Sequence, residues 1–198
     1  MAEKKKARLI HGLSNFHMAV LNKDDSTGVE YGTIEHIEGA VSVSGTPNEE
    51  STPKYADNGI FAQLDNFESF DVEMAAVDIP EEMQADMFGE KVVNGVTFSN
   101  KDDIKKEIAL GFEAKLRGGG KRFYWLLKGT PAIMGIEHAT DEGTITAQDA
   151  NLSISFRPLM YNGEWRARLS SEIVSTEDWF ADVVYDEETA EVLPTATP

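Results

Sequence analysis

Short stretches of alternating apolar and polar residues recur along the chain. Residues 41–44, 69–74 and 152–157 place apolar side chains at every second position, as Phe70 and Val72 illustrate. A period of two puts one set of side chains on a buried face of a strand and the other set on its opposite face. The pattern predicts antiparallel strands, each covered on one side.

One helix is predicted over residues 79–88. Asp78 is a candidate cap, Pro80 suits the first helical turn, and two glutamates follow near the positive end of the helix dipole. Gly89 can end the helix. We therefore expect a helix of two to three turns.

Residues 100–117 fit two patterns, because their apolar positions fall at helical spacing and also alternate. Gly111 would cost a helix about 1 kcal/mol relative to alanine. The block 122–128 is rich in aromatic and bulky apolar residues, and the glycines 118–120 separate it from the first block. A hairpin explains both blocks, so we expect strands from about residue 107.

Three stretches look irregular. Residues 45–59 combine glycines, prolines and polar residues with almost no apolar content, which predicts a long polar loop. Residues 1–8 are basic and are expected to form a solvated arm. Residues 177–198 become acidic after two aromatic residues and predict a C-terminal arm with a frayed end. The predicted fold is a single mostly β domain over residues 1–198, a β-sandwich or barrel of antiparallel strands with one short helix.

Composition narrows the range of functions. The 198 residues contain no cysteine, which excludes disulfides, thiolate chemistry and cysteine-based zinc sites. With 18 basic and 35 acidic residues the net charge is −17, and a surface this acidic repels phosphate. A nucleic-acid-binding role is therefore not expected. The chain has no run of about 18 apolar residues, so we expect no membrane-spanning segment.

Motifs that could carry chemistry are weak. The glycines 118–120 precede Lys121, but a phosphate-binding loop needs Ser or Thr where Arg122 stands, so a hairpin turn is favoured. No nucleophile motif is present, and we expect no enzyme, cofactor or metal site. Two groups of histidines and acids do not match a ligand spacing: Glu35, His36 and Glu38, and Glu137, His138, Asp141 and Glu142.

Three tryptophans, Trp125, Trp165 and Trp179, could bind a sugar or anchor a core or an interface. We favour anchors, with Trp125 on the same strand face as Phe123 and Leu127 by period two. A carbohydrate-binding β-sandwich that uses its tryptophans remains the alternative function.

The chain carries a series of short segments in a fixed order: residues 17–25 (HMAVLNKDD), 29–32 (VEYG), 37–40 (IEGA), 55–59 (YADNG), the predicted helix, then 110–113 (LGFE), 123–129 (FYWLLKG) and Trp179-Phe180. In this order they resemble the major tail proteins that form the tail tube of siphophages of Gram-positive bacteria. The resemblance covers about residues 8 to 184. A departure is Thr130-Pro131, where an apolar residue is commoner.

The resemblance implies a structural virion protein, made in the host cytoplasm, whose homohexameric rings stack into a tube. The expected partners are further copies of the chain, the tape measure protein, and the tail terminator and distal tail proteins. Genomic DNA would pass through the lumen without specific binding, and no membrane is involved.

Within that resemblance, acidic residues on the polar face of an inner strand are expected to line the channel, with the strands around Glu113 and Ser153 as the alternative lining. The candidate lining residues are Glu68, Asp71 and Glu73. The polar loop is expected to join neighbouring rings through Pro47, Asn48, Glu49, Glu50 and Lys54. Trp125, Phe123 and Trp179 are the expected core or interface anchors.

Overall fold

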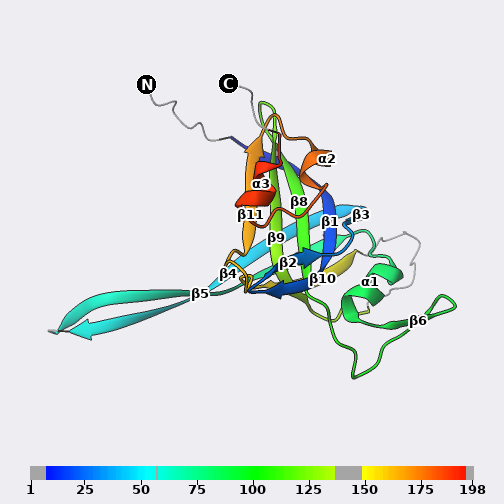
Figure 1. The fold of residues 1–198 in the computed structure, drawn as a ribbon, viewed down its shortest axis with the longest axis horizontal. Helices are drawn as coiled ribbons and strands as arrows, with labels where there is room; N and C mark the ends of the chain where they lie inside the picture. The colour runs from blue at the N-terminus through cyan, green and yellow to red at the C-terminus, as the bar shows by residue number, and fades with distance from the viewer. Residues whose placement is uncertain (1–7, 57, 137–148, 195–198) are drawn as a thin grey trace, which may run out of the picture.

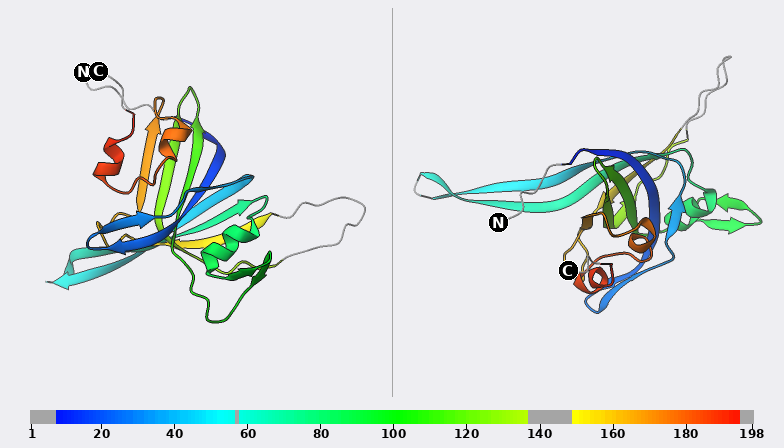
Figure 2. Two further views of the ribbon diagram at one scale, coloured as in Figure 1. Left: turned by 45° about the vertical axis from the view of Figure 1, so that its right-hand side comes forward. Right: turned by 90° about the horizontal axis from the view of Figure 1, so that it is seen from above.

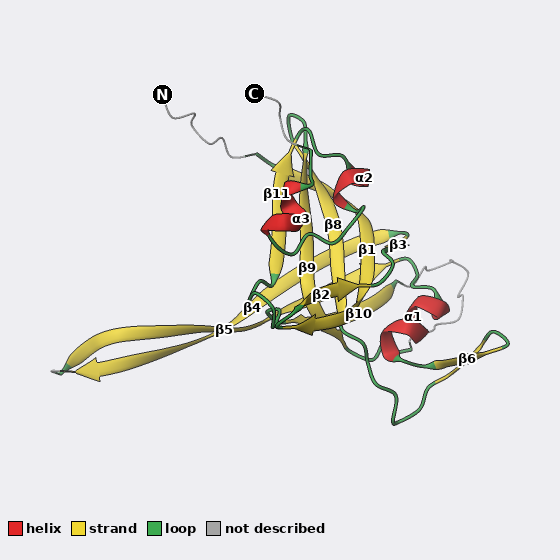
Figure 3. Cartoon of the chain, in the orientation of Figure 1, coloured by secondary structure: helices red, strands yellow, loops and turns green. Residues whose placement is uncertain are grey.

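The computed structural model describes residues 8–56, 58–136 and 149–194. This part of the chain is mostly β, as predicted, and its strands are antiparallel (Figures 1 and 3). The strands are β1 (Ile10–Asp25), β2 (Gly28–Tyr31), β3 (Glu35–Ile37), β4 (Ala40–Ala56), β5 (Gly59–Ala76), β6 (Lys91–Val93), β7 (Val96–Phe98), β8 (Ile108–Leu116), β9 (Lys121–Pro131), β10 (Ala150–Phe156) and β11 (Arg166–Ser171). The helices are α1 (Glu81–Phe88), α2 (Thr176–Trp179) and α3 (Glu187–Glu191).

One large sheet folds over itself into two layers. Its strand order is β2-β1-β8-β9-β10-β5-β4, with β11 paired to β9 and β3 paired to β1. The sheet divides at β9, whose first part pairs with β11 and whose end pairs with β10. Figure 1 shows β1, β8, β9 and β11 side by side, while β4, β5 and β10 run across them.

The first hydrophobic core lies between these layers. It joins Phe16 and Met18 of β1, Val72 and Met74 of β5, and Leu152 of β10, together with residues of β8 and α1. The strands bury Val72, Met74, Leu152, Ile154 and Phe156, as the period of two predicts. Val43 and Phe70 are half-buried, and Val41, predicted to be buried, is exposed. Burial of these side chains is the main favourable contribution to folding.

A second core lies on the opposite face of β8 and β9. There Phe123 and Trp125 of β9 meet Trp179, Phe180 and Val183 of the C-terminal segment. The prediction of a C-terminal arm over residues 177–198 is wrong for the described part of that range. This segment covers an apolar sheet face that would otherwise meet water, so β8 and β9 are buried on both sides.

The predicted helix is confirmed as α1, and Gly89 ends it in the left-handed conformation with φ 69°. The residue before the helix is Pro80, and no side-chain cap forms, so Asp78 does not act as the cap. The β8–β9 hairpin is confirmed as well. No helix in the described part of the chain is long and apolar enough to cross a membrane.

The prediction of a loop over residues 45–59 is wrong. Residues 45–56 belong to β4, and Gly59 starts β5. The two strands form one long hairpin, which is paired from Ala40 opposite Ala76 at its base to Ala56 opposite Gly59 at its end. The prolines of this stretch do not prevent pairing, because β4 is the last strand of the sheet and one of its edges needs no donor.

Candidate functional site: an exposed arm and the acidic face at its base

The β4–β5 hairpin extends far beyond the body of the protein. β10 pairs with β5 only from Phe70 to Ala76, and beyond this point β4 and β5 pair with each other alone. Figures 1 and 2 show the free part projecting away from both layers. We call residues 49–56 and 58–67 the arm; it begins at a bulge next to Asn48.

The end of the arm carries large apolar side chains in water. Tyr55, Ile60, Phe61 and Leu64 are between 62% and 75% exposed. Tyr55 lies opposite Ile60, and a bulge leaves Phe61 without a cross-strand partner. Both edges of the arm also present backbone groups that no further strand pairs with among the described residues. Two-stranded ribbons are marginally stable alone, and open edges invite pairing with other chains.

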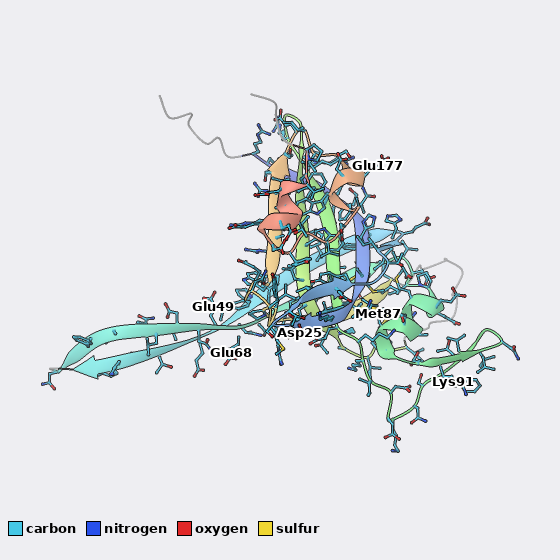
Figure 4. All side chains as sticks on the ribbon, viewed as in Figure 1. Asp25, Glu49, Glu68, Met87, Lys91 and Glu177 are labelled. Atoms are coloured by element: carbon cyan, nitrogen blue, oxygen red, sulfur yellow. The ribbon has the colours of Figure 1, made fainter. Side chains whose placement is uncertain are left out.

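The five residues expected to contact the neighbouring ring all lie on β4 and are all exposed. They do not form a loop, and two of them, Pro47 and Asn48, precede the arm. Asn48 donates from Nδ2 to Asp71 Oδ2 at 2.6 Å, which fixes the start of the arm to the body. Figure 4 shows Glu49 where the hairpin leaves the body.

Two of the three candidate lining residues share one outward face. Asp71 and Glu73 are exposed, whereas Val72 and Met74, which alternate with them along β5, are buried. Ser155 lies opposite Asp71 on β10 and donates to its Oδ1 at 2.7 Å. In the same way Ser153 Oγ donates to Glu73 Oε2 at 2.6 Å. The result is a polar face across β5 and β10, which we call the acidic face.

Asp71 keeps its charge at neutral pH. The hydrogen bond from Ser155 lowers the pKa of Asp71 below its ordinary value, and the side chains of Asn48 and Ser69 add to this effect. Hydrogen bonds of this kind stabilise the ionised carboxylate more than the protonated form. Asp71 is therefore a fixed negative charge at the base of the arm.

Glu68 is exposed but stands apart from the other two residues. The period of two does not place Glu68 on the face of Asp71 and Glu73, and β5 continues past it to Gly59. Ser69 pairs with Asn48 and Phe67 pairs with Glu49, so Glu68 is the additional residue of a bulge. Bulges change the direction of a side chain and bend the strand.

The predicted anchors are confirmed as core residues. Trp125 and Phe123 have no exposed surface and Trp179 is 2% exposed. Trp125 Nε1 donates to the carbonyl oxygen of Trp179 at 3.3 Å, which ties β9 to the C-terminal segment. Trp165 is half-buried and stacks on Phe67 with ring centroids 4.8 Å apart. Trp125 and Trp179 therefore offer no open ring face to a sugar.

The weaker motifs take structural positions. The glycines 118–120 all have positive φ and form the turn between β8 and β9, as predicted. Glu35 and His36 belong to β3, and the described residues contain no group of three side chains arranged to hold a metal. The second histidine–acid group, residues 137–142, lies outside the described residues.

Pattern reasoning missed a buried carboxylate network around Glu113, which is 1% exposed. Its carboxylate accepts hydrogen bonds from Asn15 Nδ2, Lys121 Nζ and Thr176 Oγ1, each at 2.8 Å. The network joins β1, β9 and α2, so Glu113 holds the C-terminal segment in place. A channel lining at Glu113, the alternative to the acidic face, is excluded by this burial. Ser153, named with it, lies on the acidic face beside Glu73.

Asp24 forms a second buried ion pair that the sequence did not reveal. Lys128 Nζ lies 2.6 Å from Asp24 Oδ2, and the backbone N–H groups of Met160 and Tyr161 donate to the same carboxylate. Burial alone would raise the pKa of Asp24, but these hydrogen bonds outweigh it and lower the pKa.

A scan of the chain against protein-family models finds no match, and no curated protein matches it with significant similarity. The resemblance to tail tube proteins therefore stays a prediction. The function is argued from the arm and the acidic face.

Proposed function

We propose that this chain is a self-assembling structural protein, the subunit of a phage tail tube whose homohexameric rings stack into a channel. The observation that carries the proposal is the arm: a two-stranded ribbon with open edges and an apolar end, which the monomer leaves uncovered. The resemblance of the sequence to tail tube proteins supports the same function.

Association would stabilise the arm strongly. Covering a large apolar side chain contributes roughly 1.5–3 kcal/mol, and the arm has four such side chains near its end. Pairing of its open edges with neighbouring strands would satisfy further backbone groups. An exposed apolar patch of this kind marks an interaction surface in a soluble protein.

The position of the arm favours rings and filaments over a simple closed pair. An arm that contacts a different surface of the next copy makes a heterologous contact. Such contacts generate a ring when the rotation closes and a filament when it does not. A tube built from stacked rings needs one contact that closes each ring and another that repeats from ring to ring.

The acidic face is then the proposed wall of the channel. DNA in a channel passes within about 8–10 Å of the wall, the Debye length near physiological salt, and so experiences the sign of the wall charge. Asp71 and Glu73 give phosphates no cationic partner, and they release no counterions from DNA. The genome, and before it the tape measure protein, would pass through such a channel; terminator and distal tail proteins would cap its two ends.

Microscopy and mass measurement test this function. The purified protein, examined by negative stain and by light scattering over a range of concentrations, is expected to form rings or tubes. Assembly should be sought at low and high salt and with a crowding agent. A chain that stays monomeric under all of these conditions contradicts the proposal.

A further inference from the structure

An apolar groove of about 480 Å³ opens between the two layers near the base of the hairpin. Val43 of β4 and Phe70 of β5 line one side, and Phe112 and Tyr124 of β8 and β9 line the other. The two rings of the second side stack with centroids 4.7 Å apart. The volume falls in the range of roughly 300–1,000 Å³ that accommodates small ligands, so it is large enough for aromatic and aliphatic side chains.

The groove is basic although the protein is strongly acidic. Its lining residues, all in the described part of the chain, include Arg166 and His11 and no acid. Arg168 lies opposite Tyr124, and Arg122 lies opposite Ala114, so two further arginines flank the lining residues. Cross-strand partners share one face of a sheet, which places these charges at the border of the groove.

The arm has the complementary character. Its end is apolar, and its charged residues are mainly acidic. Among the described arm residues, Glu49, Glu50 and Asp65 lie between the base and the apolar end, and a single lysine, Lys54, lies beside that end. An acidic ribbon with an apolar end matches an apolar groove with a basic border. Complementary charge of this kind selects partners and orients their approach.

Another groove fits the arm less well. It has a volume of about 550 Å³ and lies between β11 and the C-terminal segment. Glu164, Asp186 and Glu187 outnumber Arg166 and Arg168 among its lining residues. This majority of acids would repel the arm, so charge favours the groove between the layers.

We infer that the end of the arm of one copy docks into the groove between the layers of a second copy. The arm cannot fill the groove of its own chain, because the strand from Phe61 to Phe70 spans about 30 Å and leads away from the body. The occupant is therefore another copy of this chain. The inference rests on the proposed self-assembly and assigns the surface that receives the arm.

Cross-linking between introduced cysteines tests this contact, because the chain has no cysteine of its own. Gln63→Cys places a thiol on the arm and leaves the apolar residues intact; Ser42→Cys places one at the edge of the groove. The strand between Gln63 and Ala75, the partner of Ser42, spans about 40 Å, so a short bismaleimide cannot join the two thiols within one chain.

The matched control combines Gln63→Cys with Ser99→Cys, another exposed serine outside the groove. The arm–groove variant is expected to give a ladder of covalent dimers and higher oligomers on a denaturing gel, and the control is expected to give no ladder. An equal yield from both variants, or none from the first, overturns the assignment of this groove.

The outcomes separate the two proposals. If the wild-type protein forms rings or tubes but the arm–groove pair does not cross-link, the proposed function stands and the groove is wrong. If the wild-type protein stays monomeric at every concentration, the proposed function fails, and the inference fails with it. Phe61→Asp adds a second readout: it should abolish assembly, whereas Val92→Asp, an exposed apolar residue of β6, should not.

Discussion

Two hairpins of this protein have the same local pairing and opposite surroundings. β8 and β9 are covered on both faces; Gly111, for example, leaves so little space that an added Cβ would lie 2.7 Å from the Trp125 ring. The arm is also paired along its length, with a bulge near each end, but most of its side chains are exposed on both faces. Regular pairing does not depend on burial, and burial decides which hairpin stabilises the monomer.

The comparison separates two sources of stability. The β8–β9 hairpin lies between two hydrophobic cores, so its side chains contribute directly to the free energy of unfolding. Apart from Phe67, which stacks on Trp165 at the base of the arm, the arm gains backbone hydrogen bonds and a few surface contacts such as Ser51 Oγ to Asp65 Oδ1 at 2.6 Å. Its apolar end can contribute to stability only when another molecule covers it.

Truncating the central tryptophan should have the largest effect. Trp125→Ala removes a side chain with no exposed surface that contacts the C-terminal segment. The expected loss is about 3–5 kcal/mol of unfolding free energy, because a large cavity would remain. Denaturant unfolding followed by circular dichroism measures it.

Phe61→Ala on the arm is the matched aromatic control, since Phe61 is 75% exposed. Its unfolding free energy should stay within about 0.5 kcal/mol of wild type. Comparable losses in the two variants would show that the arm belongs to the folding unit, and the contrast between the hairpins would fail.

The sequence predicted the parts of the fold in which one strand face is strongly apolar. β5 near Val72 and β10 show that alternation, whereas the β8–β9 hairpin was predicted from two apolar blocks separated by three glycines. The arm was missed because its pattern lacks an apolar face, and two prolines resemble loop residues. The arm is extended because β4 and β5 pair with each other, and this pairing cannot be read from either segment alone.

The C-terminal segment was missed for a different reason. Its helices are only one turn long, and periodicity is not readable at that length. A local signal was present: Ser175 and Asp178 form a capping box at the start of α2. That signal locates a helix end but does not say which sheet face the segment will cover.

The candidate site was also predicted only in part. The alternation of side chains along β5 correctly placed Asp71 and Glu73 on the outward face, because a period of two can be read from the local sequence. The bulge at Glu68 depends on the register with β4 and was not readable. The burial of Glu113 depends on covering segments about 60 to 100 residues away in the chain, and no local pattern contains them.

Removing the Asp24 carboxylate should have the second-largest effect, and it extends the comparison to charges. Asp24→Asn breaks a buried ion pair with Lys128 in the body, with an expected loss of about 1.5–3 kcal/mol at neutral pH. Because the folded-state pKa of Asp24 lies below its unfolded value near 3.9, its stabilisation is present above that pH. It is lost as the pH falls through the lower folded-state pKa.

Urea unfolding from pH 7 to pH 2.5 measures this dependence. The wild-type protein should lose unfolding free energy more steeply below about pH 4 than the Asp24→Asn variant. Asp65→Asn serves as the control, because it removes a carboxylate from the exposed arm without breaking a buried ion pair. Identical profiles for wild type and Asp24→Asn would rule out this ion pair as a source of acid sensitivity.

Removing the arm should change assembly and leave stability almost unaltered. The cut must take both strands, because deleting residues 46–54 alone would strip β5 of its partner. Replacing residues 50–66 by Asn-Gly joins Glu49 to its cross-strand partner Phe67 through a tight hairpin turn and keeps the stacking of Phe67 on Trp165. The variant is expected to unfold within about 0.5 kcal/mol of wild type and to form no rings or tubes.

Calorimetry and negative-stain microscopy of the same preparation read both properties. A shortened protein that still forms tubes would show that the arm is not the assembling element. A loss of cooperative unfolding would show instead that the arm stabilises the body, and either result removes the distinction between the two regions.

Reversing the charge of the acidic face should have the smallest effect on folding and should act only on transport. Asp71 and Glu73 are exposed, and their hydrogen-bond partners Ser155, Ser153 and Asn48 can turn to water, so the double change to lysine should cost little stability. The variant should still form rings and tubes, since the arm is unchanged. In a virion each ring would then present lysines that bind phosphate and release counterions, and genome ejection should slow or stop.

The rate of ejection is measured by triggering purified particles and detecting the released DNA with a DNA-binding dye, at several salt concentrations. Higher salt should restore the rate in part, because screening weakens contacts between lysine and phosphate. Glu81→Lys with Glu82→Lys on α1 adds the same charge at exposed positions outside both the proposed wall and the arm, and should not slow ejection. A normal rate for Asp71→Lys with Glu73→Lys would place the acidic face outside the channel.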